Sequence, residues 1–209
     1  MPTHAARRTL SGMRRLLLAT SNPGKVREFR RLLATVPFEV VTPADLGLSL
    51  DVEETGASYA ENATLKARAF AEAAGCLALA DDSGIEVDAL DGRPGLYSAR
   101  YGGPGLDDAG RTALLLDEMR DVPDGVRTAR YQAVVAVASP AGDVALFDGQ
   151  CEGAIGRSCR GARGFGYDPV FVVGDGRAAA EMGDTEKDAI SHRGKAVRAA
   201  AEYLRGLAE

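Results

Sequence analysis

The hydrophobic and polar pattern is most distinctive at residues 77–84, where a short apolar run leads directly into two carboxylates. Residues 77–80 (Leu-Ala-Leu-Ala) are too few for a helix of their own, so they predict a buried strand. Asp81 and Asp82 follow, and Ser83-Gly84 predicts a turn that ends this strand at a functional edge. Successive side chains of an extended backbone point to opposite faces. We therefore expect one carboxylate to face a metal and a water and the other to anchor a lysine or an amide; ordinary turn chemistry is the alternative.

The rest of the pattern predicts alternating strands and helices. Apolar runs predict strands at residues 15–20, 39–42, 85–90 and 170–173, and a pair of strands at 130–138 and 144–148 joined by a turn. Helical spacing predicts helices after residue 25, at 107–119 and at the C-terminus, where the last helix follows Ser191 and ends near Leu207. A capping box at residues 58–61 predicts a helix from Tyr59 to Ala74 that Gly75 stops. Together these elements predict an α/β fold with a mixed sheet.

Length and composition narrow the class of protein. The 209 residues contain no linker-like stretch, so we expect one domain at residues 13–209, in one or two lobes, after a disordered extension at residues 1–12. Apolar runs stay well below the roughly 18 residues of a membrane span. Three cysteines without a Cys-x-x-Cys motif indicate neither a disulfide framework nor a zinc site, so a reduced, cytoplasmic protein is expected. A net charge of −5 argues against nucleic-acid binding.

An acidic protein with an anionic substrate needs local positive charge, and two stretches offer it. The strand–turn–helix pattern at residues 20–25 can present backbone N–H groups and a helix dipole to a phosphate beside Lys25. It is not a Walker A loop, because the first glycine is missing and Val26 follows the lysine. A turn that simply starts a helix is an equally good interpretation. Asn62 and Lys66, four residues apart, share one helical face, for which a solvated face is the favoured interpretation when the pair is taken alone.

Residues 161–169 form a glycine-rich loop that presents two aromatic rings and a carboxylate. Phe165 could stack on a flat ring, Asp168 could accept a hydrogen bond from it, and the glycines let a ligand approach closely. A mobile structural loop is the alternative. The sequence lacks a Gly-x-Ser-x-Gly elbow and an Asp-x-Asp motif at the strand end, which argues against a serine hydrolase and a phospho-aspartyl enzyme.

Metal-assisted hydrolysis of a nucleotide fits the candidate carboxylates, lysines and glycine-rich loop better. Glu54, Asp81 and Asp82 offer the hard oxygen ligands that Mg²⁺ prefers, and lysines suited to phosphates accompany them. Six ordered blocks then make the chain recognisable: residues 20–25, residues 54–67, residues 80–84, residues 94–101, residues 164–169 and residues 191–193. In these blocks the chain closely resembles the Ham1-type nucleoside triphosphate pyrophosphatases, also called inosine/xanthosine triphosphatases. The resemblance runs from Leu16 to about Leu204; the N-terminal extension and Asp188 depart from the family pattern.

The resemblance implies an elongated, two-lobed α/β fold with a central substrate cleft, and a homodimer. It also implies Mg²⁺-dependent hydrolysis of deaminated purine nucleoside triphosphates (ITP, dITP, XTP) to the monophosphate and pyrophosphate, which cleanses the nucleotide pool. Asp82 would be the general base and, with Glu54, a metal ligand; Asp81 and Asn62 would support the site. Substrate would be bound by Thr20, Ser21, Asn22, Pro23, Gly24, Lys25, Lys66, Ser83, Phe165, Gly166, Tyr167, Asp168, Lys187, His192 and Arg193, with Phe165 stacked on the purine.

Base discrimination is expected to rest on the purine 6-position, where a donor such as Arg193 pairs with a 6-keto oxygen but faces another donor when the base is adenine. Each buried polar group left unpaired costs about 1–3 kcal/mol, so two mismatches suffice for a hundredfold preference. Two other interpretations stay open: a pyrophosphatase of different base specificity, and a nucleotide-sensing protein without turnover.

Overall fold

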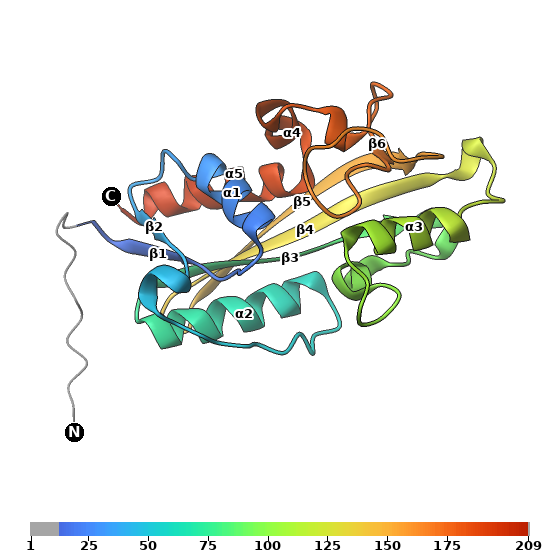
Figure 1. Ribbon diagram of the computed structural model, residues 1–209. Helices are drawn as coiled ribbons and strands as arrows, with labels where there is room; N and C mark the ends of the chain where they lie inside the picture. The colour runs from blue at the N-terminus through green and yellow to red at the C-terminus, as the bar shows by residue number, and fades with distance from the viewer. Residues whose placement is uncertain (1–12, 209) are drawn as a thin grey trace. The chain divides into compact units, whose positions relative to one another are not determined.

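The computed structural model describes residues 13–208, so the extension predicted at residues 1–12 lies outside the described residues (Figure 1). Its strands are β1 (Arg15–Leu18), β2 (Glu39–Val41), β3 (Leu77–Val87), β4 (Thr128–Ala138), β5 (Val144–Ile155) and β6 (Phe171–Val172). Its helices are α1 (Pro23–Leu32), α2 (Tyr59–Ala74), α3 (Asp108–Glu118), α4 (Asp184–Ile190) and α5 (His192–Gly206). Among the described residues, every helix is too short or too polar to cross a lipid bilayer.

The six strands form one mixed sheet in the order β2-β1-β3-β4-β5-β6. Strand β1 pairs in parallel with both β2 and β3, whereas β5 and β6 pair antiparallel. A tight turn after β4 closes the predicted hairpin, since the Ser139 N–H donates to the Asp143 carbonyl oxygen (2.9 Å). The predicted mixed sheet and its antiparallel portion are therefore confirmed.

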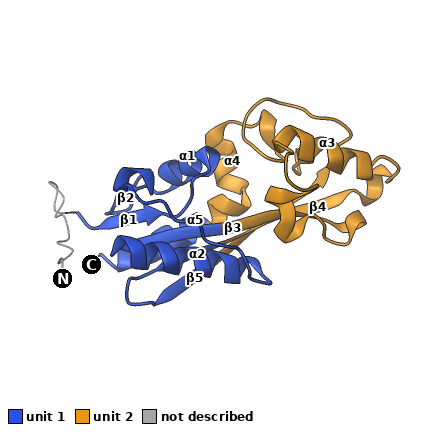
Figure 2. Ribbon diagram, turned by 60° about the horizontal axis from the view of Figure 1, so that its bottom comes forward, with its two compact units in different colours: residues 1–81, 135–147, 197–209 blue, residues 82–134, 148–196 orange. Residues whose placement is uncertain are grey.

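The chain divides into two compact units, coloured separately in Figure 2. Among the described residues, unit 1 comprises 13–81, 135–147 and 197–208, and unit 2 comprises 82–134 and 148–196. In unit 1, the fully buried leucines of β1 and Phe29 of α1 belong to the core. In unit 2, Ile85, Leu115 and Phe171 belong to one buried cluster. Strand β3 contributes to both units, because the boundary falls between Asp81 and Asp82.

Local capping explains why the helix signals in the sequence were reliable. Helix α2 has the predicted bounds: the Ser58 hydroxyl accepts the Glu61 N–H (3.2 Å), and Gly75 ends the helix in the left-handed conformation at φ 63°. The Glu61 carboxylate accepts the N–H of Ala57 (2.7 Å) rather than that of Ser58, so the capping box is shifted by one residue. Helix α1 starts where Asn22 caps it, with Pro23 in its first turn.

Two sequence predictions about strands were wrong, and one helix was not predicted. Strand β3 does not end at a Ser-Gly turn but continues through Ser83 and Gly84 to Val87, so residues 85–87 are part of the same strand. The remainder of the predicted strand at 85–90 is a 3-10 turn, Asp88–Leu90. Helix α4, which lies directly before α5, was not predicted. Its first turn contains two acidic residues, Asp184 and Glu186.

Candidate active site

The two carboxylates of β3 lie in the middle of a central, buried strand rather than at its end. Asp81 is 2% exposed and Asp82 is 6% exposed. A buried carboxylate needs a charged or hydrogen-bonding partner, because desolvation of an isolated charge costs several kcal/mol. The alternation along the strand predicted separate partners for the two carboxylates. The structure confirms this for Asp81, which anchors a lysine.

Lys25 is that partner, and it comes from the first turn of α1. Its Nζ lies 2.9 Å from each carboxylate oxygen of Asp81, with the two side chains 18% and 1% exposed. The predicted phosphate turn has a fixed shape, because the Asn22 side-chain oxygen accepts the N–H groups of Gly24 (2.8 Å) and Lys25 (3.1 Å). Asn22 therefore acts as a helix cap. The side chain of Lys25 carries the positive charge of this turn and is paired with Asp81.

Lys66 reaches the same strand from α2. Its Nζ donates to Glu54 Oε1 (2.8 Å) and to the backbone carbonyl oxygen of Asp81 (2.7 Å). Asn62, one turn earlier on this helix, is fully buried and accepts the Gly56 N–H through Oδ1 (2.8 Å). The solvated-face interpretation of this pair is therefore wrong: Asn62 holds the loop that carries Glu54, and Lys66 ties Glu54 to β3.

The loop needs a glycine at position 56, because its backbone lies very close to helix α2 there. A Cβ atom at this position would lie 2.6 Å from Glu61 Cβ and 2.7 Å from Asn62 Oδ1, closer than carbon and oxygen atoms can pack. The absent side chain lets the loop backbone rest on the first turn of α2. Glu54 is thereby held two residues before the point of contact, within reach of Lys66.

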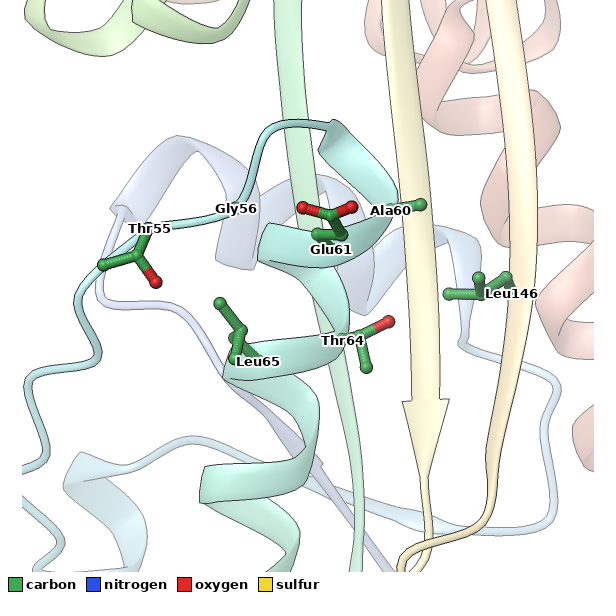
Figure 3. A pocket seen from close by; sticks show the side chains of 7 residues that line it. All are labelled: Thr55, Gly56, Ala60, Glu61, Thr64, Leu65 and Leu146. Atoms are coloured by element: carbon green, nitrogen blue, oxygen red, sulfur yellow. The ribbon is translucent and has the colours of Figure 1, made fainter.

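The same loop and helix line a hollow of about 400 Å³ in unit 1, shown in Figure 3. Thr55, Gly56, Ala60, Glu61, Thr64 and Leu65 line it, together with Leu146 of β5. Glu61 is the only titratable group among these described lining residues, and its carboxylate is bound to the Ala57 N–H. The lining shown in Figure 3 therefore offers neither the lysines nor the paired carboxylates that the proposed chemistry needs.

In unit 2, Asp82 is followed by Ser83, whose N–H donates to Asp82 Oδ1 (3.0 Å). The Ser83 hydroxyl accepts a hydrogen bond from Arg193 Nη2 (2.9 Å), and Arg193 is 3% exposed. Arg193 lies at the start of α5, where the Ser191 hydroxyl accepts the Gly194 N–H (3.0 Å) and so caps the helix. A predicted base-binding arginine is thus bonded to the residue next to the proposed general base.

The glycine-rich loop is ordered by Asp168. Asp168 Oδ2 accepts hydrogen bonds from the Phe165 N–H (2.9 Å) and from Lys187 Nζ (2.6 Å), and the carboxylate is buried. A Cβ atom at Gly164, where φ is 75°, would overlap this carboxylate. The charges of Lys187 and Arg193 lie 5.1 and 5.5 Å from the centroid of the Phe165 ring. Two predicted base-pocket cations therefore lie over the Phe165 ring, and Asp168 binds one of them.

Two further predicted base-pocket residues, Tyr167 and His192, are also buried. The Tyr167 hydroxyl donates to the Ser98 carbonyl oxygen (2.9 Å) within the unit 2 core, and burial raises the pKa of this phenol strongly. His192 is 4% exposed and stacks on Tyr131, with centroids 4.5 Å apart and planes 8° from parallel. The geometry gives Tyr167 a packing role. Sequence reasoning missed Tyr131, which carries no motif signal and lies on β4.

A divalent cation fits the chemistry of the predicted metal ligands. Glu54 and Asp82 both offer hard carboxylate oxygens, and Lys66 ties Glu54 to the carbonyl of the residue before Asp82. Within residues 13–208, however, no cluster of three or more His, Cys, Asp or Glu side chains forms a complete metal site. Phosphate oxygens and waters would therefore complete the coordination, as is usual for Mg²⁺ in nucleotide enzymes.

Comparison with known proteins decides the family. The model of the Ham1 family matches residues 16–203. The chain belongs to this family. The dITP/XTP pyrophosphatase of Symbiobacterium thermophilum is 52% identical over 199 residues, which are 94% of this chain and 98% of that protein. The dITP/XTP pyrophosphatase of Thermus thermophilus is 50% identical over 194 residues, 92% of either chain.

Solved structures of Ham1 proteins confirm the fold. A HAM1 protein from Coxiella burnetii superposes with a TM-score of 0.84 at 38% sequence identity, and the match covers 93% of this chain and all of that one. A dITP/XTP pyrophosphatase from Mycobacterium abscessus matches with a TM-score of 0.71 at 44% identity, covering 89% and 98% of the two chains. The predicted family and its mixed α/β fold are both confirmed.

Proposed function

We propose that the protein hydrolyses deaminated purine nucleoside triphosphates (dITP, ITP and XTP) to the monophosphate and pyrophosphate. The observation that carries this proposal is the convergence of two lysines on the Asp81 position of β3, one from α1 and one from α2, directly before Asp82. The names of the relatives, dITP/XTP pyrophosphatase, support the same enzyme class and substrates.

The lysines are suited to hold the triphosphate. Lys25 and Lys66 each form an ion pair with a carboxylate, and each carries its ammonium group, with three donor hydrogens, on a flexible stem. A triphosphate can take over part of these contacts without a rearrangement of the backbone. Binding then exchanges one anionic partner for another, and the existing ion pairs hold the lysines in place before substrate arrives.

Asp82 is proposed as the general base. It would orient a water in line with the α-phosphorus and take one proton as the water oxygen forms a bond to that phosphorus. The bond from the α-phosphorus to the bridging oxygen breaks at the same centre, and its electron pair leaves with pyrophosphate. The monophosphate keeps the water oxygen.

We propose Glu54 and Asp82 as the protein ligands of Mg²⁺. When bound, this ion would neutralise phosphate charge and favour the departure of pyrophosphate. Lys66 would support metal binding, because its hydrogen bond to Glu54 holds this carboxylate in place. We also propose that the protein is a cytoplasmic homodimer, as the family resemblance implies; light scattering of the purified protein would check the oligomeric state.

Phe165 is proposed as the surface on which the purine stacks. A base on this ring would lie within reach of the donors of Lys187 and Arg193, whose charges lie over the ring at 5.1 and 5.5 Å from its centroid. Both side chains are donors only, so they suit a 6-keto oxygen and leave the 6-amino group of adenine unpaired. Such a mismatch costs about 1–3 kcal/mol per buried group.

The test is to incubate the purified protein with Mg²⁺ and dITP, XTP, GTP or ATP, and to assay pyrophosphate and orthophosphate separately. Pyrophosphate from dITP and XTP, with about a hundredfold less from ATP, is the expected result. Orthophosphate as the product would mean attack at the γ-phosphorus and would contradict the proposal. Binding without product from any of the four would favour a nucleotide sensor.

A further inference from the structure

Helix α3 contacts the glycine-rich loop at a point that no motif of the sequence identifies. Asp108, in the first turn of α3, accepts the Gly166 N–H through Oδ2 (2.9 Å). Thr112, one turn later on the same face, donates through its hydroxyl to the Gly166 carbonyl oxygen (3.4 Å). One helical turn therefore holds both polar groups of the residue that follows Phe165.

The loop backbone around Phe165 is fixed from two directions. The Phe165 N–H is bound by Asp168, which belongs to the loop, and the next N–H along the chain is bound by Asp108, which does not. Gly166 has φ 60°, and a Cβ built there would meet nothing within 4 Å, so its own packing does not define this conformation. The polar contacts with α3 supply the missing constraint.

Asp108 is itself held in place. Its other oxygen, Oδ1, lies 3.6 Å from Arg111 Nη1. The start of α3 is capped independently by Asp107, whose Oδ1 accepts the Gly110 N–H (2.8 Å). The helix can therefore form without Asp108, while the contact with Gly166 cannot.

We propose that Asp108, supported by Thr112, is a positioning residue that sets the orientation of the Phe165 ring and so contributes to base recognition. This inference rests on the proposed function, in which Phe165 stacks on the purine. Stacking acts on the bound substrate and on the transition state alike, so loss of the constraint is expected to raise KM and to leave kcat nearly unchanged.

The experiment compares Asp108→Ala with Asp108→Asn, whose side-chain oxygen can still accept the Gly166 N–H. Asp108→Ala is expected to raise KM for dITP about tenfold with kcat within about twofold, as loss of a charge-assisted hydrogen bond allows. Asp108→Asn is expected to restore KM to within about threefold of the wild type, because a neutral acceptor keeps part of the bond. Inorganic triphosphate, used as a competitive inhibitor without a base, should bind the wild type and both variants equally.

Asp107→Ala is the matched control, since it removes the cap of the same helix without touching Gly166. It is expected to lower the melting temperature and to leave KM unchanged. An unchanged KM in Asp108→Ala would overturn the inference. So would an equal rise in KM in Asp107→Ala and Asp108→Ala. Weaker inhibition of Asp108→Ala by inorganic triphosphate would also overturn it. Absence of dITP hydrolysis in the wild type would instead contradict the proposed function.

Discussion

Lysine–carboxylate pairs occur in both candidate regions, but their surroundings differ. In unit 1, Lys66 and Glu54 are 14% and 27% exposed, and the loop that carries Glu54 reaches solvent on both sides of it. In unit 2, Lys187 and Asp168 are 11% and 4% exposed, and Asp168 also holds the backbone of the glycine-rich loop. The first pair is open to an incoming anion, whereas the second is closed and shapes the loop.

This difference suggests a division of labour. A partly exposed ion pair contributes little to folding and leaves its lysine available for a phosphate, while a buried pair is costly to break because it leaves an unpaired charge in the interior. Loss of the carboxylate from the Lys66–Glu54 pair should therefore change protein stability little, whereas loss of its lysine should reduce activity. Loss of the carboxylate from the Lys187–Asp168 pair should reduce both protein stability and base recognition.

The largest expected effect follows from breaking the buried pair. Asp168→Asn leaves the ammonium of Lys187 without its carboxylate, which is expected to lower the free energy of unfolding by about 3–5 kcal/mol. Glu54→Gln, in the partly exposed pair, should lower the free energy of unfolding less, by about 1 kcal/mol. Urea denaturation of the two variants measures the contrast; equal losses would show that the two pairs do not differ in the way described.

Removal of a phosphate lysine is the next largest effect. Lys66→Met removes the bonds to Glu54 and to the Asp81 carbonyl oxygen, and it should reduce kcat/KM about a hundredfold, typical of one or two charge-assisted bonds. Because the triphosphate is common to all substrates, the ratio of kcat/KM for dITP and ATP should stay constant. Lys195→Met, on the exposed face of α5, is the control and should retain activity. A changed base preference in Lys66→Met would contradict this assignment.

Two glycines of the loop sharpen the comparison further. Gly164 and Gly166 both have positive φ, 75° and 60°, so alanine costs about 1–2 kcal/mol at either position. Only at Gly164 would the new methyl group also overlap the Asp168 carboxylate. Gly164→Ala should therefore raise KM for dITP more than Gly166→Ala does, and steady-state kinetics on both variants would show the order. The reverse order would mean that Asp168 does not fix the loop.

The smallest effect concerns an exposed pair outside both regions. Hydrogen bonds from Thr128 and Arg130 lower the pKa of Asp88 below its usual value. A carboxyl with a lowered folded-state pKa stabilises the protein above its unfolded-state pKa of about 3.9, and this contribution is lost as pH falls through the folded-state pKa. Asp88→Asn should therefore cost at most about 1 kcal/mol at pH 7 and nothing near pH 2. Thermal unfolding at both pH values tests this; a cost that grew on acidification would contradict it.

Much of the fold could be predicted because its signals are local. Ser58, Gly75 and Asn22 mark helix ends through contacts with residues at most four positions away. The length of β3 could not be predicted in this way, since the chain stays extended through Ser83 and Gly84, where a turn was expected, as part of a strand between β1 and β4. Long-range strand pairing outweighed the local turn propensity of Ser83 and Gly84.

The candidate site shows the same limit. Lys25 and Asp81 are 56 residues apart, and their pairing was expected only in general terms, as a lysine anchored by one of two carboxylates. Asp108 and Gly166 are 58 residues apart, and nothing near either residue signals the contact. Tyr167 shows the converse, because a motif position suggested a ligand contact where the phenol is already bonded in the core. Motifs suggested some supporting residues, such as Asn62, but not Asp108, whose contact with Gly166 depends on the fold.

The central claim is that Asp82 directs a water to the α-phosphorus. Hydrolysis of dITP in ¹⁸O-labelled water, followed by mass spectrometry of both products, tests it directly. The account predicts label in the monophosphate and none in pyrophosphate, with turnover reduced about a thousandfold in Asp82→Asn, as expected for loss of a general base. Label in pyrophosphate would place the attack at the β-phosphorus and contradict the account, and so would full turnover in Asp82→Asn.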